Sequence, residues 1–374
     1  MFRSIDRRIL FDILKRNRYR SRVKRQTGLY PLESMNVFVT MRCNAKCEHC
    51  FCWQDLNIGI PELSLEHYTR LAEQFIPLEL MCFTGGEPTL RKDLLEVAKA
   101  FASRGMVSTV MINTNGLKPD LLVELTERFK TEFPDHGLVF QLSIDGLEET
   151  HDRIRGVPGN YKKVIESLQK IWKLKQRFTT AFTAVALTVI TDQNYRELVA
   201  LNDALRAEVG NDFYQGFELL RDVERTAWNI PDEVREKGVG PKNMDLPPRE
   251  AFDQIAADLT FINRRNPYRL DPFHLHNLLQ LEMVKTGKPA APCVTAGQSV
   301  GVLYANGDVA HCEFTLPFAN VADFGFDFRA LWHSEAANKR RSQITGCHCI
   351  HGCFHGKSVE FDPMMLARMA VKTI

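Results

Sequence analysis

The chain has 374 residues, of which 44% are hydrophobic and 25% charged, the balance of a globular protein rather than a disordered or fibrous one. Lys and Arg outnumber Asp and Glu by only 48 to 46, so the chain as a whole lacks the basic excess of proteins whose main partner is nucleic acid. No apolar stretch approaches the roughly 20 residues that cross a bilayer, and the N-terminus lacks the apolar run of a signal peptide. We therefore expect a cytoplasmic protein with no transmembrane span and about two domains.

The N-terminal segment, residues 1–34, is the most basic part of the chain. Its first 26 residues carry ten Lys and Arg against two Asp, a local net charge of +8, which leaves about −6 for the rest. Apolar residues recur from Phe2 to Leu14 at helical spacing, which predicts an amphipathic helix with its arginines on the other face. Two interpretations stay open: a solvated helix docked on the protein, or a contact with an anionic membrane surface or an acidic partner.

Short β-rich runs alternate with amphipathic segments throughout residues 35–221. Nearly continuous apolar runs of this kind indicate strands buried on both faces. The predicted strands are 35–41, 78–84, 107–113, 138–144, 181–190 and 213–220, and the helical segments between them include 64–75, 92–103, 161–173 and 194–205. The pattern predicts an α/β fold, a partial (β/α)6 barrel of TIM type, with its chemistry at the carboxyl ends of the strands.

The remainder of the chain divides into two parts. Residues 222–290 begin with a Pro-, Gly- and charge-rich linker and continue with helical segments at 249–263 and 272–285. Residues 291–374 form a small C-terminal domain, in which Asn306-Gly307 predicts a hairpin between strands at 299–304 and 308–312.

Ten cysteines in a chain expected to be cytoplasmic indicate metal ligands or reactive thiols rather than disulfides. Cys43, Cys47 and Cys50 form a C-x3-C-x2-C loop directly after the first predicted strand. Three thiolates so spaced can hold three irons of a cubic iron-sulfur cluster and leave the fourth iron open to a chelating ligand. The alternative is a zinc site that recruits His49 or His67 as a fourth ligand.

Four further segments stand at or just after successive predicted strands. Thr84-Gly85-Gly86-Glu87-Pro88 follows the second strand, Asn113-Thr114-Asn115-Gly116 the third, and Ser143-Ile144-Asp145-Gly146 the fourth, with His151-Asp152-Arg153-Ile154-Arg155-Gly156 shortly beyond. Together with the cysteine loop they resemble the radical S-adenosylmethionine (SAM) superfamily, over about residues 35–220.

The resemblance implies a set of functional residues. Cys43, Cys47 and Cys50 would bind a [4Fe-4S] cluster, with the amino and carboxylate groups of SAM on its open iron. Thr84, Gly85, Gly86 and Glu87 would hold the SAM amino group, Pro88 would shape the turn, Asn115, Ser143 and Asp145 would contact the ribose and methionine groups, and Arg155 would meet the SAM carboxylate.

A second group of cysteines lies near the C-terminus: Cys293, Cys312, Cys347, Cys349 and Cys353. The spacing C-x13-G-x4-C with a later Cys-rich tail is similar to the C-terminal extension called SPASM, or its shorter form, twitch. This resemblance implies one auxiliary [4Fe-4S] cluster, with Cys293, Cys312 and Cys353 as ligands and either Cys347 or Cys349 as the fourth. A structural zinc ribbon is the alternative.

The resemblance also implies a reaction. A radical SAM oxidoreductase or maturase cleaves SAM reductively to a 5′-deoxyadenosyl radical, which abstracts hydrogen from a small, carbohydrate-like metabolite or from a peptide, and a flavodoxin or ferredoxin-type protein is the reductant. The rival functions are a zinc-stabilised binding protein and a nucleic-acid-modifying radical enzyme. We do not expect nucleic acid, because the basic run at residues 15–25 contains a single aromatic residue, Tyr19. Glu218, Asp308, His311 and Glu313 lie near predicted edges of the site, but no catalytic acid or base is assigned.

Overall fold

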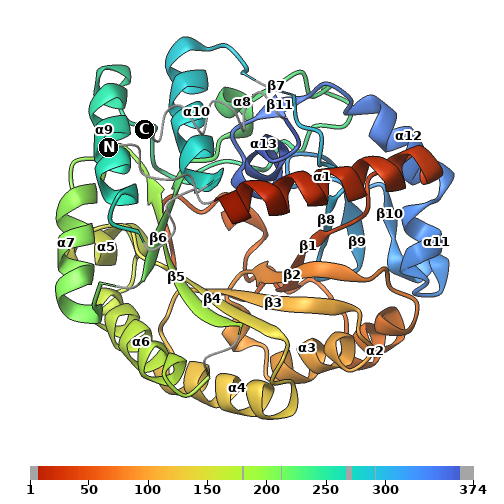
Figure 1. The fold of residues 1–374 in the computed structure, drawn as a ribbon, viewed down its shortest axis with the longest axis horizontal. Helices are drawn as coiled ribbons and strands as arrows, with labels where there is room; N and C mark the ends of the chain where they lie inside the picture. Colours follow the sequence, from red (N-terminus) through yellow and green to blue (C-terminus); the bar gives the residue numbers. More distant parts are fainter. Residues whose placement is uncertain (1–6, 179–180, 212, 267–271, 291, 363–374) are drawn as a thin grey trace.

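The computed structural model describes residues 7–178, 181–211, 213–266, 272–290 and 292–362. Six parallel strands follow one another in chain order across its sheet and curve into a partial barrel (Figure 1). They are β1 (Ser34–Thr40), β2 (Leu78–Gly85), β3 (Val107–Thr114), β4 (Gly137–Ser143), β5 (Phe182–Ile190) and β6 (Tyr214–Leu219). Each predicted strand is confirmed to within one residue at either end.

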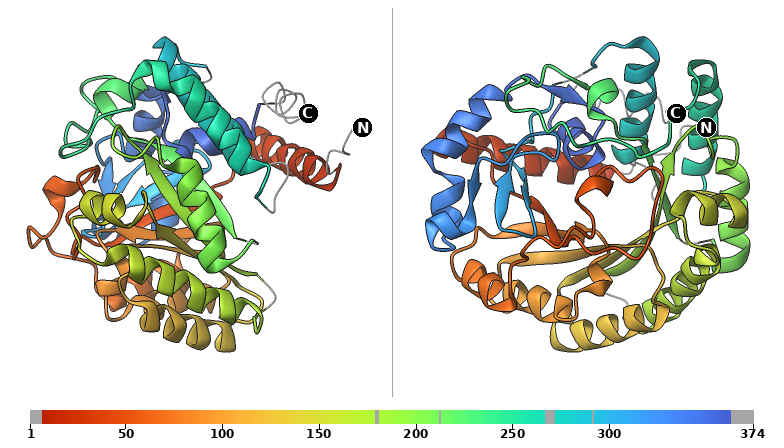
Figure 2. Two further views of the ribbon diagram at one scale, coloured as in Figure 1. Left: turned by 90° about the vertical axis from the view of Figure 1, so that its left-hand side faces the viewer. Right: turned by 180° about the vertical axis from the view of Figure 1, so that it is seen from behind.

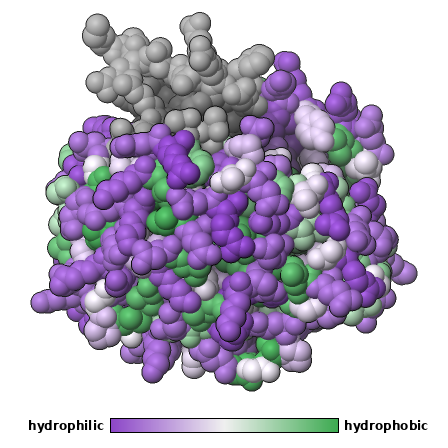
Figure 3. Space-filling model, turned by 90° about the horizontal axis from the view of Figure 1, so that it is seen from below, coloured by the Kyte–Doolittle hydropathy of each residue, from purple (hydrophilic) through white to green (hydrophobic). Residues whose placement is uncertain are grey.

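Helices cover the convex face of this sheet, as Figure 1 shows. They are α2 (Leu65–Glu73), α3 (Leu94–Ala102), α4 (Pro119–Glu132), α6 (Asn160–Lys175) and α7 (Leu198–Val209). The apolar faces of the helices pack on buried strand residues such as Phe83 and Phe140 in one large core. The outward faces of α3, α4 and α6 are mainly hydrophilic (Figure 3), as expected for helices with one side in water.

The C-terminal strands extend the same sheet beyond β1. β8 (Val300–Leu303) pairs with β1 in parallel, and β9 (Asp308–Ala310) and β10 (Ala319–Asn320) follow in antiparallel pairings. The predicted hairpin is confirmed as β8 and β9. The chain continues through η4 (Val321–Phe324), α11 (Phe328–Trp332), α12 (Glu335–Gln343), β11 (His348–Cys349), the π-helical turn η5 (Gly352–Gly356) and α13 (Lys357–Val359).

The segment between the barrel and these strands is largely irregular, as predicted, but it is not a free linker. It contains α8 (Val223–Thr226), β7 (Ala227–Trp228) and η3 (Arg249–Ala251), followed by α9 (Phe252–Asn263) and α10 (Pro272–Thr286). β7 pairs antiparallel with β11, inside the Cys-rich tail. The amide of Gly240 donates to the carbonyl of Phe51, and that of Lys242 to Glu48, so this segment also packs on the cysteine loop.

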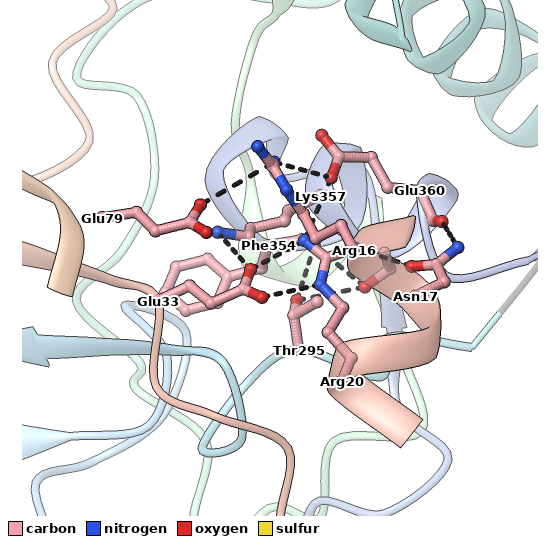
Figure 4. Close-up of polar contacts among 10 residues, drawn as sticks. Arg16, Asn17, Arg20, Glu33, Glu79, Thr295, Phe354, Lys357 and Glu360 are labelled. Atoms are coloured by element: carbon pink, nitrogen blue, oxygen red, sulfur yellow. Dashed lines mark hydrogen bonds and ion pairs between the residues drawn. The ribbon is translucent and has the colours of Figure 1, made fainter. Parts of the chain in front are cut away.

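Helix α1 (Arg7–Thr27) lies at the amino ends of β1 and β2, and its N-terminal half projects beyond the body of the molecule (Figure 2). The prediction that its arginines face solvent is wrong for Arg20, which is fully buried. The reason is that the carboxylates of Glu33 and Glu360 lie beneath the helix and pair with the Arg20 guanidinium at 2.7 and 3.1 Å (Figure 4). No helix within the described residues has the length and apolarity needed to cross a membrane.

Candidate functional site: a cavity at the carboxyl ends of the strands

A cavity opens where the parallel strands end, which is where a barrel of this type binds its ligands. Its walls come from the cysteine loop, Asn36 of β1, the ends of β2, β3, β4, β5 and β6, and two points of the C-terminal part of the chain. Among the lining residues are Cys43, Cys47, His49, Cys50, Thr84, Gly85, Gly86, Glu87, Asn115, Ser143, Arg155, Glu218, Arg221, Glu313 and Cys353. The structure thus brings together residues that the sequence placed on five separate segments.

The loop after β1 holds Cys43, Cys47 and Cys50 at the edge of this cavity. The side chain of Asn57 fixes the start of the loop, because it bonds to both the amide nitrogen and the carbonyl oxygen of Cys43, at 3.0 and 3.1 Å. Two amides later in the loop donate to carbonyls at the end of α5 (Glu148–Arg155). The three thiols are therefore held by backbone contacts independent of any bound group.

The histidines considered as zinc ligands have other surroundings. His67 caps α2, where its ring accepts from the amide of Ser64 at 3.2 Å, so it is engaged away from the cavity. His49 lines the cavity, and burial lowers its pKa to about 4, so the ring is neutral near pH 7. Three thiols beside an open cavity are instead a donor set that fits an iron-sulfur cluster with one open corner.

The glycine pair after β2 is required by the protein's own backbone. A Cβ atom on Gly85 would lie 2.3 Å from the carbonyl oxygen of Thr40, and one on Gly86 would lie 2.2 Å from that of Arg42. The amides of Gly86 and Glu87 donate to these same two carbonyls, both at 2.8 Å. The segment therefore abuts the end of β1 and the start of the cysteine loop, and side chains at either glycine would separate the two.

Glu87 joins the end of β2 to the end of β3. One carboxylate oxygen accepts from the Thr89 amide and hydroxyl and from the Thr114 hydroxyl, and the other accepts from the Asn115 amide at 2.7 Å. Burial raises the pKa of this carboxyl group. Pro88 begins the turn η2 (Pro88–Leu90) and is buried. Glu87 thus sets the position of two of the strand ends that border the cavity.

Arg155 is the most connected cation of the site. Its Nε lies 2.6 Å from a carboxylate oxygen of Asp145, which is fully buried, and its Nη1 donates to the Cys47 sulfur at 3.6 Å. Burial alone would raise the pKa of the Asp145 carboxyl group. The guanidinium of Arg155 instead holds this pKa below its ordinary value. His151 accepts from the Asp145 amide at 3.0 Å and so fixes the loop from beneath. The arginine therefore couples the loop after β4 to the first cysteine group.

A second part of the wall was identified from the sequence only in part: Glu313 was placed near the edge of the site, whereas Asn36 and Arg221 were not named. Glu313 accepts from Asn36 at 2.7 Å, from His351 at 2.9 Å and from Arg221 at 3.1 Å. Against the effect of burial, His351 and Arg221 lower the pKa of Glu313 to about 2. Asn36 is a polar residue inside the buried strand β1, and Arg221 lies two residues after β6. These two polar residues were the features of the sequence that could have indicated this part of the wall.

Glu218, at the end of β6, contributes a second buried carboxylate to this wall. It accepts from Gln280 of α10 at 3.0 Å. Of the four residues left unassigned at the site edges, Glu218 and Glu313 line the cavity. Asp308 and His311 do not; the His311 ring packs instead against Phe318 and Trp332.

The five C-terminal cysteines share one buried cluster, with Cys312, Cys347 and Cys349 inside it and Cys293 and Cys353 packed against it. The amide of Cys293 donates to the carbonyl of Cys347 at 2.8 Å, and a hydrogen bond from the Cys347 thiol lowers the pKa of Cys293 to about 6. Burial is the main cause that raises the pKa of Cys312. The negative charges of the Cys349 and Cys293 thiolates raise it further. Cys353 differs: burial raises its pKa to about 11, and its charged neighbours are cavity residues, first Arg221 and then Glu313.

Comparisons with known proteins agree with this geometry. Residues 37–203 match the model of the Radical SAM superfamily. The chain is 33% identical over 174 residues to Fe-coproporphyrin III synthase of Methanosarcina barkeri, covering 46% of this chain and 40% of that protein. It is 34% identical over 247 residues to PqqA peptide cyclase of Rhizobium meliloti, covering 60% of this chain and 61% of that one.

The fold has counterparts among solved structures. SuiB of Streptococcus suis bound to S-adenosylmethionine aligns over 88% of this chain and 73% of its own, with a TM-score of 0.56 and 15% identity, a likeness of fold. The curated relatives above are matched over less than two thirds of their length. Residues 37–203, a radical SAM domain by their match to the superfamily model, carry the cysteine loop, the glycine pair and Arg155.

Proposed function

We propose that the chain is an enzyme that cleaves S-adenosylmethionine at this cavity and uses the resulting 5′-deoxyadenosyl radical to abstract hydrogen from a substrate. The observation that carries the proposal is the convergence of Cys43, Cys47 and Cys50 on one cavity at the carboxyl ends of the strands. A [4Fe-4S] cluster on these thiolates supplies the electron that cleaves SAM. The residues of the chain hold the reactants, exclude water and position the substrate.

The SAM contacts are proposed on the residues that border the cavity beside the cysteine loop. Thr84, Gly85, Gly86, Asn115 and Ser143 line it directly. Glu87, Pro88 and Asp145 act by shaping its wall, since the carboxylates of Glu87 and Asp145 are engaged by protein donors. Arg155 places a positive charge beside Cys47, which favours the thiolate that a metal ligand must be.

The auxiliary cluster is proposed on Cys293, Cys312, Cys347 and Cys349. The electrostatic influence of these four thiols on one another's pKa supports this set, and the position of Cys353 in the cavity wall supports leaving it out. The ligand set therefore differs in one member from that expected on sequence resemblance. Reconstituted Cys349→Ala protein should lose about half of the iron bound by the wild type, whereas Cys353→Ala protein should keep it. Equal losses in the two variants would restore Cys353 to the ligand set.

The substrate is proposed to be polar. The wall formed by Asn36, Glu218, Arg221 and Glu313 presents two carboxylates, a guanidinium and an amide to the cavity, which suits a hydroxyl- or amide-bearing metabolite or a peptide better than a hydrocarbon. A peptide is supported by the similarity to a PqqA peptide cyclase, and a metabolite by the similarity to Fe-coproporphyrin III synthase. The reductant is proposed to be a flavodoxin or ferredoxin-type protein.

The test is SAM cleavage without substrate. Anoxically reconstituted, dithionite-reduced protein should release methionine and 5′-deoxyadenosine, and the Cys43→Ser/Cys47→Ser/Cys50→Ser variant should release neither. A matched control, Cys82→Ser, changes a buried thiol outside both groups and should retain the activity. Zinc in place of iron after reconstitution, with no 5′-deoxyadenosine, would favour the zinc-stabilised binding protein instead.

A further inference from the structure

The loop after β1 carries a fourth thiol that the proposed function does not use. Cys52 lies two residues after Cys50, and the two sulfur atoms are 3.8 Å apart. Cys50 is half-buried, Cys52 is buried, and both border the cavity. A small molecule that enters the cavity can therefore reach this pair of thiols.

The other two thiols of the loop have different neighbours. The Cys43 sulfur accepts a hydrogen bond from the Ala45 amide at 3.5 Å, and the Cys47 sulfur accepts one from Arg155 at 3.6 Å. Within the described part of the chain, Cys50 is the one of the three proposed cluster ligands that is in hydrogen-bond contact with another thiol. The contact therefore singles out Cys50 and Cys52 as the two sulfurs of the loop that can be joined.

The backbone permits a bond between these two sulfurs. Residues 51 and 52 form a turn that leads into η1 (Trp53–Asp55). Consecutive Cα atoms are about 3.8 Å apart, so a turn brings residues two positions apart within the range of about 4.4–6.8 Å that a disulfide spans. Rotation about the side-chain bonds then brings the two sulfurs from contact to bonding distance.

We propose that Cys50 and Cys52 form a reversible disulfide when hydrogen peroxide reaches the cavity of the cluster-free protein. The Cys50 thiolate attacks a peroxide oxygen, so the O–O bond breaks, Cys50 becomes a sulfenic acid, and one water leaves with the thiol proton. The Cys52 thiol then attacks the Cys50 sulfur, the S–O bond breaks, and a second water leaves. Two thiols thus lose two electrons in all, and one peroxide is reduced to two waters.

The disulfide and an iron-sulfur cluster exclude each other at Cys50, because a metal ligand must be a thiolate. Cys50 is a cluster ligand only in the proposed function, so this consequence rests on that function, whereas the disulfide itself does not. A sulfenic acid with no second thiol to condense with passes on to sulfinic acid, which thiol reductants do not reverse. Cys52 therefore keeps Cys50 recoverable, since a dithiol reductant returns both thiols.

The first test uses cluster-free protein treated with stoichiometric hydrogen peroxide. Free thiols are then alkylated, and the tryptic peptide 47–70 is analysed by mass spectrometry, because it holds Cys47, Cys50 and Cys52 and has no internal Lys or Arg. In the wild type and in the control variant Cys82→Ser, this peptide should be two hydrogen masses lighter and carry one alkyl group, on Cys47. Dithiothreitol before alkylation should restore three alkyl groups.

The second test separates a thiol that reacts with Cys50 from one that only fills space. With excess peroxide, Cys50 of the Cys52→Ser variant should carry sulfinic acid at least about threefold more often than Cys50 of the wild type, and dithiothreitol should not reverse it. Cys52→Ala, which places no hydroxyl in the buried site, should behave alike.

Recovery of SAM cleavage links the pair to the proposed function. After peroxide, thiol reduction and reconstitution, Cys52→Ser should release at least about threefold less 5′-deoxyadenosine than wild type treated alike, although the untreated proteins should match. No cleavage by any untreated protein would contradict the proposed function, and the peptide measurements would still decide the disulfide.

Three results would overturn the proposal. Peptide 47–70 of the oxidised wild type contains no internal disulfide; its disulfide includes Cys47; or Cys50 of Cys52→Ser is oxidised to sulfinic acid no more often than Cys50 of the wild type. The last result would make Cys52 a structural thiol alone.

Discussion

Replacing Arg155 by methionine should leave a buried charge without its partner. The guanidinium Nε and the Asp145 carboxylate are 2.6 Å apart, and their side chains are 9% and 0% exposed. Two unit charges centred about 4 Å apart attract each other by about 4 kcal/mol at the effective dielectric of a partly buried site. This agrees with the cost of about 3–5 kcal/mol for removing one partner of a buried ion pair in other proteins.

The loss of stability in Arg155→Met should increase as pH rises. In the wild type the folded pKa of Asp145 is lowered, so its contribution to stability is present above the ordinary value near 4 and is lost as pH falls through the folded value. In the variant, burial acts unopposed by Arg155 and raises the folded pKa, so the stability deficit grows as pH rises.

Urea unfolding of the cluster-free proteins at pH 5 and pH 7 measures this difference. We expect Arg155→Met to lose about 4 kcal/mol at pH 7 and clearly less at pH 5, and Asp145→Asn/Arg155→Met to recover much of the loss. A deficit below about 1 kcal/mol at both pH values, or strictly additive effects in the double variant, would refute the assignment of Arg155 as the partner of a buried carboxylate.

Two further substitutions test the packing around the site. Gly86→Ala should destabilise the protein by more than about 2 kcal/mol, because its Cβ would meet the Arg42 carbonyl at 2.2 Å, whereas Gly240→Ala, with no atom within 4 Å of the new Cβ, should be nearly neutral in thermal unfolding. Arg20→Met should release α1 and raise the rate of trypsin cleavage within it about tenfold, because its buried carboxylate partners lose their cation, while exposed Arg18→Met should leave cleavage at the other sites of the helix unchanged.

The sequence was sufficient to predict the barrel strands and the edge of the sheet at which the candidate residues gather. Strands such as Phe182–Ile190 are nearly continuous apolar runs, and the chemistry-bearing segments follow them in order, so local pattern and chain order determined both. In the structure the paired glycines approach the backbone at Thr40 and Arg42, a contact that no local pattern reveals.

What could not be predicted depends on contacts between distant parts of the chain. The pairing of β8 beside β1 joins residues more than 250 positions apart, and it is this pairing that brings Glu313 to Asn36 and completes the cavity. The helical pattern of α1 predicted solvent-facing arginines, and only the placement of Glu33 and Glu360 beneath the helix explains why Arg20 is buried.

The same reasoning applies to the C-terminal cysteines. The spacing C-x-C-x3-C of Cys347, Cys349 and Cys353 is compatible with several ligand sets. In the structure the pairing of β11 with β7 holds Cys349, and the turn η5 then carries Cys353 to the cavity wall. Spacing alone could not distinguish these outcomes, because both elements depend on segments that lie far away in the sequence.

The central claim is that Cys43, Cys47 and Cys50 hold a [4Fe-4S] cluster whose fourth iron is open to SAM. The most direct measurement is the electron paramagnetic resonance spectrum of a variant with Cys293, Cys312, Cys347 and Cys349 replaced by alanine, so that only the first cluster remains, reduced with dithionite. The account predicts a [4Fe-4S]⁺ signal whose g values shift when SAM is added, because the cofactor binds the open iron. A cluster signal that SAM leaves unchanged, or no cluster at all in the correctly folded variant, would contradict it.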